Sequence, residues 1–413
     1  MLKYYRIKDL AKVSTGGTPS REDEGNFTSN KNDGVMWIKP EDLKGTKDFI
    51  RETREYITCL GLKKMKKFSP HDSIIFSGIG EIGKMGIAKN DFTTNQQNHI
   101  LYSISCNRDY LFYSLFSKRK NINKLAKGNV VKIFNSSELK RIIVGIPENE
   151  KQLKIVKYLR KNENSLEDKI KKYNKKIELL KEYKEALIYE TVTKGLDKNV
   201  EMKDSGIDYI GLCPKKWSIK RIKNFYKLGM GQTILKEDVL DEGLYPILSA
   251  TEKDVVFGYL NKINIMLREN DMVIPARGNS IGFVKIIRKE SGCTQTTIYM
   301  KKNKNKHVLP KYVYYYLIGN KKFIFNYNNT AIPQITVNDI NGKELLCPSI
   351  IEQNKIVDFL DKKTKEIDSE VEKLSKKIEL IEELKESIIY ECVTGKIDIE
   401  IEGEKYQKII ESI

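Results

Sequence analysis

The sequence is poor in cysteine and histidine and has no long apolar run, and each shortage excludes a class of protein. Its six cysteines lie far apart and form no CxxC pair: they are Cys59, Cys106, Cys213, Cys293, Cys347 and Cys392. This spacing excludes a disulfide framework and most zinc sites, and it favours reduced thiols in a cytoplasm. Three scattered histidines offer no metal cluster either. Apolar stretches span only a few residues and no signal-peptide pattern opens the chain, so we expect a cytoplasmic protein without a membrane span.

What the sequence does have is a strong excess of basic residues. Lysine and arginine number 74 against 56 aspartates and glutamates, which gives a net charge of +18 over 413 residues. A hydrophobic content of 40% is sufficient for two or three folded domains. A polyanion, most simply nucleic acid, is the partner that this charge predicts. The alternative is a lysine-rich surface without such a partner.

An internal repeat organises the sequence. Residues 147–193 and 348–394 align without a gap at an offset of 201, and both contain the block KKIEL. A weaker repeat lies outside them, for example Gly16-x-Thr18 against Gly231-x-Thr233. Repeats of this kind indicate duplicated structural units. The predicted domains are a first module at 1–146, a helical segment at 147–195, a second module at 196–347, a helical segment at 348–396 and an acidic tail at 397–413.

The two repeated segments have the apolar spacing of coiled-coil helices. Apolar residues recur in alternating steps of four and three, and this period of about 3.5 indicates a seam between two helices. The seam positions are Leu166, Ile170, Tyr173, Ile177, Leu180, Lys184 and Leu187 in the first copy and Ile367, Val371, Leu374, Ile378, Ile381, Lys385 and Ile388 in the second. Gly195 and Gly395 follow as helix stops. We expect the helices to pair with each other, antiparallel rather than parallel, which would place the modules in an inverted pseudo-twofold arrangement.

The two modules read as mixed α/β folds, so the predicted fold class is α/β (α+β). Short β-rich runs alternate with turn signals, and helical stretches stand nearer the end of each module. The net charge is +11 for the first module and +9 for the second, against +4 and −3 for the helical segments and −3 for the tail. The modules therefore hold the surplus charge that would contact phosphates, and the helices are better suited to hold them apart.

Sequence motifs of self-contained catalysis are missing. The segment Gly78-Ile79-Gly80-Glu81-Ile82-Gly83 has the GxGxxG spacing of a dinucleotide loop, but a second short strand rather than a helix is predicted after it. We interpret it as a glycine-rich hairpin turn. The sequence has no P-loop, HExxH, kinase or PD…ExK nuclease motif, and no Pro-Pro pair of the kind found in adenine methyltransferases. These absences argue against an enzyme.

Candidate DNA-contacting residues are polar or basic side chains at predicted turns of the modules. Arg277 has the planar fork that reads guanine, and Gln96, Gln97 and Asn98 have amides that can address adenine. The candidates are Lys39, Lys84, Asn95, Gln96, Gln97, Lys236, Arg277, Asn279, Lys285, Gln295 and Gln334. For each of them a merely solvated side chain is the alternative. Trp37 and Trp217 are interpreted as core residues rather than base-stacking ones.

The junction after the first helical segment resembles a known family. It reads Thr191-Val192-Thr193-Lys194-Gly195-Leu196-Asp197, then Met202 to Ile207, Tyr209-Ile210-Gly211, Pro214, Trp217 and Arg221-Ile222. With the Pro, Gln and Ile-Val that open each helical segment and the duplicated layout, the chain is similar almost end to end to the DNA-sequence specificity subunit of type I restriction-modification systems. One departure is that the first module has no counterpart of Pro214 and Trp217, so it is expected to start more simply.

The resemblance implies two target-recognition domains, each of which reads one half of a split, asymmetric sequence in double-stranded DNA. The long helices would dock two modification (methyltransferase) subunits, which bring S-adenosylmethionine and methylate an adenine in each half. Restriction subunits would add translocation and cleavage that depend on ATP and Mg. The chain itself would bind no cofactor and no metal, and catalysis would belong to the partner subunits.

Two functions of other classes stay open from the residues alone. The chain could be a nuclease or methyltransferase with an unrecognised site, or a structural coiled-coil linker whose basic modules bind protein or RNA. A target-recognition subunit of a related fused or type II system is a variant of the favoured reading.

Overall fold

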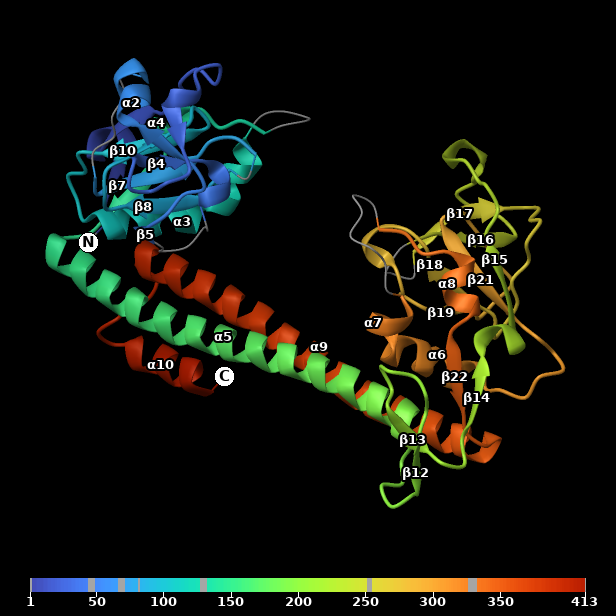
Figure 1. Cartoon of the computed structure of the whole chain (residues 1–413). Coiled ribbons are helices and arrows are strands. Elements are labelled where there is room, and N and C mark those ends of the chain that lie inside the picture. The colour runs from blue at the N-terminus through green and yellow to red at the C-terminus, as the bar shows by residue number, and fades with distance from the viewer. Residues whose placement is uncertain are drawn as a thin grey trace. The chain divides into compact units, whose positions relative to one another are not determined.

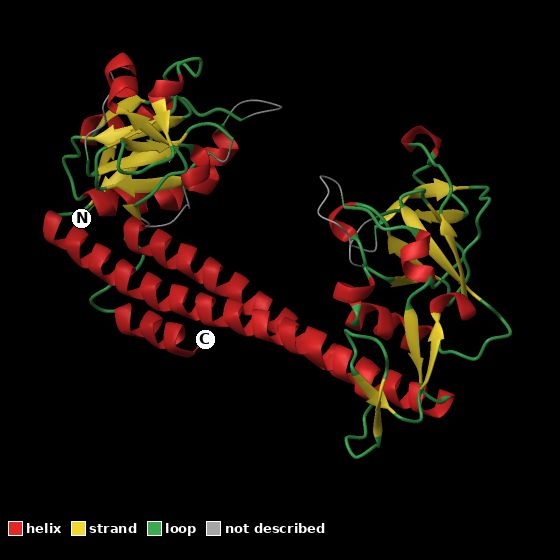
Figure 2. Cartoon of the chain, in the orientation of Figure 1, coloured by secondary structure: helices red, strands yellow, loops and turns green. Residues whose placement is uncertain are grey.

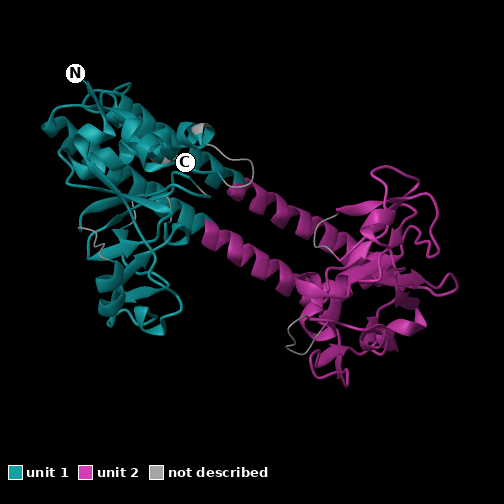
Figure 3. Cartoon of the chain, turned by 90° about the horizontal axis from the view of Figure 1, so that it is seen from above, with its two compact units in different colours: residues 1–173, 376–413 teal, residues 174–375 magenta. Residues whose placement is uncertain are grey.

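The chain folds into two compact units. A computed structural model describes residues 2–43, 49–65, 71–80, 82–126, 132–250, 255–325 and 333–412. Unit 1 comprises residues 1–173 and 376–413, and unit 2 comprises residues 174–375 (Figure 3). Each unit contains one mixed module of helices and strands together with part of each long helix (Figure 2).

The first module is built on two small sheets. The central sheet has the strand order β2-β10-β7-β8-β5, and the second sheet has the order β3-β6-β4-β9. The central strands are β2 (Lys12–Thr15), β5 (Phe49–Ile50), β7 (Ser73–Ser77), β8 (Met85–Ala88) and β10 (Asn98–Tyr102). The second sheet comprises β3 (Phe27–Thr28), β4 (Gly34–Ile38), β6 (Tyr56–Thr58) and β9 (Phe92–Thr94). A separate ribbon pairs β1 (Lys3–Arg6) with β11 (Ile143–Ile146).

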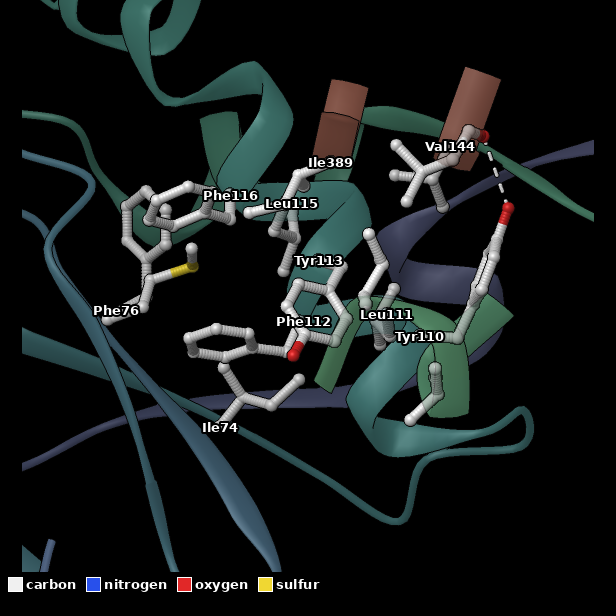
Figure 4. Packing of buried hydrophobic residues seen from close by; sticks show 14 of the residues in the cluster. Ile74, Phe76, Tyr110, Leu111, Phe112, Tyr113, Leu115, Phe116, Val144 and Ile389 are labelled. Carbon is white, nitrogen blue, oxygen red and sulfur yellow. Dashed lines mark hydrogen bonds between the residues drawn. The ribbon is translucent and has the colours of Figure 1, made fainter. Parts of the chain in front are cut away.

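Strand β7 shows why this module needs two layers. All five of its residues are buried, because successive side chains point to opposite faces and both faces are covered. Ile74 and Phe76 pack on one face against the aromatic residues of α3 (Arg108–Leu125), such as Phe112 (Figure 4). Ile75 packs on the other face with residues of the second sheet, such as Ile38. The remaining helices of the module are α1 (Ile7–Leu10), α2 (Cys59–Met65) and α4 (Ser136–Arg141).

The second module repeats the central sheet. Its strand order is β15-β21-β18-β19, which corresponds strand for strand to β2-β10-β7-β8. These strands are β15 (Tyr226–Met230), β18 (Met272–Pro275), β19 (Lys285–Ile286) and β21 (Thr297–Lys302). A three-stranded sheet holds β16 (Tyr245–Leu248), β17 (Val256–Leu260) and β20 (Gly292–Cys293), and two ribbons pair β12 (Met202–Asp204) with β13 (Leu212–Pro214) and β14 (Ser218–Arg221) with β22 (Glu344–Cys347). The helices are α6 (Pro310–Gly319), α7 (Lys321–Ile324) and α8 (Val337–Asn341).

Two long helices, α5 (Asn149–Lys194) and α9 (Ile350–Thr394), carry the repeated segments (Figure 1). Both end where the sequence predicts, because Gly195 and Gly395 adopt positive φ angles of 77° and 73° that other residues disfavour. Within unit 1, Lys385 contacts Glu163 and Glu167 while Lys377 lies over the ring of Tyr173. Residues further along α5 therefore contact residues that come earlier in α9, so the two helices are antiparallel in this unit.

Unit 2 shows the same direction of pairing. Lys176 Nζ lies 2.8 Å from Glu370 Oε1, and Lys184 Nζ lies 2.7 Å from Asp368 Oδ2. The antiparallel pairing of the two helices is thus confirmed in each unit. The buried seam positions are Leu166, Ile367, Leu374, Ile381, Lys385 and Ile388. The half-buried ones are Ile170, Tyr173, Ile177, Leu180, Lys184, Leu187, Val371 and Ile378.

The glutamine near the start of each long helix fixes the module to that helix. Gln152 donates to Pro147 O at 2.8 Å and accepts from Asn107 N at 2.8 Å, just before α3. Gln353 makes the same pair of bonds in unit 2, to Pro348 O and from Leu309 N, both at 2.9 Å. A buried amide that satisfies backbone groups on two segments explains why both helix openings carry this residue.

The tail forms a helix that the sequence reading does not include. Helix α10 (Gly403–Ser412) packs on α5 within unit 1, where Ile410 is fully buried. Tyr158 Oη donates to Gly403 O at 3.2 Å, and Lys169 Nζ donates to Ile410 O at 2.5 Å. The acidic tail is thus held on a basic helix by its buried isoleucine and by hydrogen bonds to its backbone.

Candidate nucleic-acid interface

Most of the candidate residues gather at one end of the central sheet in each module. In an antiparallel sheet the end of one strand lies beside the start of its neighbour. The ends of β2 and β7 therefore meet the starts of β10 and β8, and the ends of β15 and β18 meet the starts of β21 and β19. We call this the loop end of each module. It comprises residues 16–18, 78–80, 82–84, 95–97 and 132–134 in module 1 and residues 231–236, 276–284, 294–296 and 333–335 in module 2.

The repeated Gly-x-Thr motif holds the loop end of module 1 together. Gly17 N donates to Thr94 O at 2.7 Å. A Cβ atom at Gly16 would lie 2.0 Å from that same carbonyl oxygen, so only glycine permits this approach. Thr18 then donates from Oγ1 to Gln96 Oε1 at 2.6 Å. The motif therefore positions Gln96 at the surface.

The polar run that follows is divided between the scaffold and the surface. Asn95 is buried and donates to Gln97 Oε1 at 2.9 Å, while Asn98 is fully buried and donates to Ile38 O at 3.1 Å. Both asparagines therefore stabilise the turn. The expectation that they face DNA is corrected, because their side chains are buried. Gln96 is exposed and Gln97 is half-buried, so these two side chains remain in reach of a ligand.

Module 2 builds the same end from other residues. A Cβ atom at Gly231 would lie 2.2 Å from Thr294 O, which is the close approach already seen in module 1. Gln295 accepts from Ile234 N at 3.2 Å, and this bond joins its turn to the segment that continues into Lys236. Lys236 is exposed and begins a short 3-10 turn.

Arg277, Asn279 and Gln334 come together at this loop end. Arg277 and Gln334 face each other in an antiparallel bridge, and Asn279 lies in the 3-10 turn that follows Arg277. Gly278 has a φ of 74°, which lets the chain turn sharply after Arg277. All three side chains are exposed, and none has a side-chain hydrogen bond or ion pair among the residues that the structure describes.

Of the remaining candidate lysines, Lys39 and Lys285 are less suited to contact DNA than Lys84. Lys39 Nζ is paired with Glu55, to which Arg21 also donates at 3.1 Å, and it lies 4.7 Å from the centre of the Trp37 ring. Hydrogen bonds from Arg21 and Lys39 lower the pKa of Glu55, so this carboxylate stays ionised and retains both cations. Lys84 is half-buried directly before β8. Lys285 pairs with Val273 in mid-strand, about 13 Å along β18 from Arg277.

The glycine-rich segment between β7 and β8, which the structure describes at residues 78–80 and 82–83, is a hairpin connection. Strands β7 and β8 pair antiparallel on either side of it, with Phe76 opposite Met85. Gly80 and Gly83 adopt positive φ angles of 76° and 86°. A dinucleotide loop would lead into a helix, so the prediction of a hairpin turn is confirmed. The core assignment of Trp37 and Trp217 is confirmed too, since they are 3% and 2% exposed.

Each unit has a cavity between its module and a long helix. The cavity of unit 1 has a volume of about 600 Å³ and is bordered by Asp109 and Arg160, which form an ion pair. The cavity of unit 2 has about 610 Å³ and is bordered by Lys311 and Asp361, whose Nζ and Oδ2 lie 2.6 Å apart. Each ion pair joins a module to a long helix. The acidic partner belongs to the module in unit 1 and to the helix in unit 2. Their charged side chains are thus engaged in structural contacts.

No group of metal-ligating side chains is found in the part of the chain that the structure describes. None of the described helices is both long and apolar enough to cross a membrane. His99 is buried, contacts Phe134 O at 2.8 Å and Thr15 Oγ1 at 3.2 Å, and has its pKa lowered by burial. This histidine therefore supports the loop end from within.

Sequence reasoning missed two features of the loop ends. Thr18 belongs to the repeated Gly-x-Thr motif, and that repetition at both loop ends was the available signal. Ile79 and Ile133 form a bridge in module 1, with Ile133 48% exposed. Isoleucine gives no polar signal in a sequence, so its exposure is visible only in the fold.

Comparisons with known proteins agree on one family. The model of the type I restriction modification DNA specificity domain matches residues 2–179 and 214–380. A putative type I restriction enzyme MjaX specificity subunit from Methanocaldococcus jannaschii is 29% identical over 349 residues, which cover 79% of this chain and 78% of the relative. The type I restriction enzyme MjaIX specificity subunit of the same organism is 22% identical over 430 residues, covering 96% and 93%.

A solved structure supports the fold. It comes from work on complex assembly and conformational transition of the type I R-M system, and it aligns with 95% of this chain and 97% of its own at a TM-score of 0.69. The sequence identity is 13%, so this likeness concerns the fold alone.

Proposed function

The chain belongs to the type I restriction-modification DNA specificity family and is the non-catalytic specificity subunit of such a system, and from this premise we propose that each of its modules reads one half of a bipartite DNA target. The observation that carries the proposal is the repeated loop end. The same strand order brings exposed polar side chains to the same end of both sheets. One module would thus supply one reading surface, and two modules would supply two.

The side chains that we assign to DNA are the exposed and half-buried ones of the loop ends. They are Lys84, Gln96 and Gln97 in module 1 and Lys236, Arg277, Asn279, Gln295 and Gln334 in module 2. Amides and guanidinium groups read base edges in the major groove, while lysines contact phosphates. The module charges of +11 and +9 favour the approach to a duplex and predict affinity that falls steeply with salt.

The long helices offer equivalent surfaces for two copies of one partner. Leu179 of α5 and Leu380 of α9 are related by the repeat offset of 201, and they are 51% and 56% exposed. Leu179 lies in unit 2 and Leu380 in unit 1, so each unit presents one such leucine. Exposed apolar side chains at related positions fit a partner that binds twice. We assign this partner as the modification subunit, which would supply S-adenosylmethionine and methylate adenine, with ATP and Mg belonging to restriction subunits.

The decisive experiment maps modified bases in DNA from cells that express this chain with its cognate modification subunit. We expect a new bipartite motif with one methylated adenine in each half, absent when this chain is omitted. Replacing module 1 by that of another specificity subunit is expected to change one half of the motif only. A stable complex that produces no motif would refute the assignment to DNA recognition.

The partner assignment has its own test. Leu179→Ser and Leu380→Ser are each expected to reduce the number of bound modification subunits from two to one, as measured by native mass spectrometry. Leu153→Ser is a matched control, because Leu153 is 53% exposed on α5 but its repeat equivalent is the polar residue Asn354. Unchanged stoichiometry in both leucine variants would place the partner elsewhere.

A further inference from the structure

A short antiparallel bridge at the loop end of module 2 presents two side chains together. Gly278 N donates to Pro333 O at 3.0 Å, and Ile335 N donates to Ala276 O at 3.0 Å. Arg277 and Gln334 stand opposite each other between these two bonds. They are therefore a pair without mutual backbone bonds, the type in which opposite side chains lie closest on one face.

Module 1 has the same bridge with the same bonds. Gly80 N donates to Lys132 O at 3.3 Å, and Phe134 N donates to Gly78 O at 2.8 Å. Ile79 and Ile133 stand opposite each other between them. The glycine after each bridge residue has nearly the same φ, 76° for Gly80 and 74° for Gly278. The backbone of this element is thus duplicated almost unchanged.

The side chains on this shared backbone differ in chemistry. One bridge carries arginine and glutamine, and the other carries two isoleucines. Packing does not explain the isoleucines, because Ile133 is 48% exposed and Ile79 is only half-buried. A constant backbone that presents variable, exposed side chains is what a recognition position requires, since geometry is kept while the partner changes.

We propose that this bridge is a base-reading element of each module and that its two side chains set the base preference of the corresponding half-site. The inference rests on the proposed function. Arg277 presents a fork for guanine O6 and N7, and Gln334 beside it presents an amide for an adjacent adenine. Ile79 and Ile133 present apolar surface for the C5-methyl group of thymine. A two-stranded β-ribbon is narrow enough to enter the major groove.

The test compares methylation motifs made by the complete complex with variants of the bridge. Arg277→Lys keeps the positive charge but loses the bidentate fork, so we expect a guanine of one half to become degenerate while the other half stays unchanged. On duplexes that carry the motif, this variant is expected to lose about 5- to 150-fold of its preference for guanine at that position. Ile133→Gln is expected to alter the opposite half only.

Arg268→Ala is the matched control, because Arg268 precedes the other end of β18 and is exposed there, beside Glu290. It is expected to leave both halves of the motif intact. An unchanged motif in Arg277→Lys and Ile133→Gln would overturn the inference while leaving the proposed function in place. Absence of any motif from the parent complex would instead overturn the proposed function. A preserved unfolding midpoint in each variant confirms that the fold is intact.

Discussion

Lys385 offers the sharpest test of how the two long helices hold together. Its Nζ lies 2.9 Å from Glu167 Oε1 and 3.6 Å from Glu163 Oε1, and Tyr113 donates to Glu163 Oε2 at 2.5 Å. The side chains of Lys385 and Glu163 are only 9% and 3% exposed. Lys385→Met keeps the volume of the side chain but leaves the Glu163 carboxylate buried without its ammonium partner. Breaking a buried ion pair in this way costs about 3–5 kcal/mol of unfolding free energy.

The repeat supplies a matched control for this substitution. Lys184 is the equivalent of Lys385 at the offset of 201, and Asp368 is the equivalent of Glu167. The side chains of Lys184 and Asp368 are 29% and 61% exposed, so solvent screens this ion pair. Lys184→Met is therefore expected to lower the unfolding free energy by no more than about 1 kcal/mol. Urea unfolding followed by circular dichroism measures both losses, and hydrogen exchange of the α9 amides localises the first to unit 1.

Equal losses in the two variants would refute this reasoning, because burial is the main difference between the two sites. The double variant Lys385→Met with Glu163→Gln is expected to recover part of the loss, since it removes the buried charge that the single variant leaves behind. A double variant no better than Lys385→Met would show that the damage arises from packing instead.

Three further predictions concern other parts of the chain. Gly16→Ala is expected to lower the stability of unit 1 and to abolish recognition of one half-site in the modified-base assay, because its Cβ would lie 2.0 Å from Thr94 O. Thiol labelling at pH 8 is expected to modify the exposed Cys59 well before Cys392, because burial raises the pKa of Cys392 to about 12; equal labelling rates would contradict this. Burial lowers the pKa of His99, so its contribution to stability is present above pH 6.5 and is lost as the pH falls below that value. A pH series of unfolding midpoints should show this loss in the parent chain and a flatter profile in His99→Gln.

The sequence could predict the elements whose cause is local. The heptad spacing and the two glycine stops give α5 and α9 to within a few residues, because periodicity and positive φ are direct consequences of residue type. The hairpin at 78–83 was predictable for the same reason. The family assignment followed from the junction and is confirmed by the match of the family model.

Features that depend on distant contacts could not be predicted. Asn95 and Asn98 look like any polar turn in the sequence, but Asn98 reaches Ile38 O from 60 residues away and is buried by that contact. The Lys39 ammonium is engaged in an ion pair with Glu55, which lies sixteen residues later in the sequence. Helix α10 depends on α5, whose contacting residues stand more than two hundred positions earlier. Each of these outcomes is decided by a partner that proximity in sequence does not reveal.

The two units also show which contacts duplication preserves. Tyr110 Oη donates to Gly145 O at 3.1 Å and Tyr312 Oη donates to Leu346 O at 2.8 Å, so the same residue type fixes each module to the last strand before its helix. A buried phenol that must reach a carbonyl oxygen has few substitutes. The ion pairs Asp109–Arg160 and Lys311–Asp361 need only opposite charges, and there the two units have exchanged signs.

The same logic explains why the sequence repeat fades inside the modules while their architecture persists. A backbone bond between neighbouring strands places no demand on the side chain beside it, so the bridge of Ile79 and Ile133 and the bridge of Arg277 and Gln334 can share their bonds and differ in chemistry. A change of side chain at such a position costs the fold little stability. An exposed side chain there can therefore change to suit a different ligand. The sequence repeat is therefore strong in the long helices, whose side chains pack on each other and on the modules, and weaker in the modules themselves.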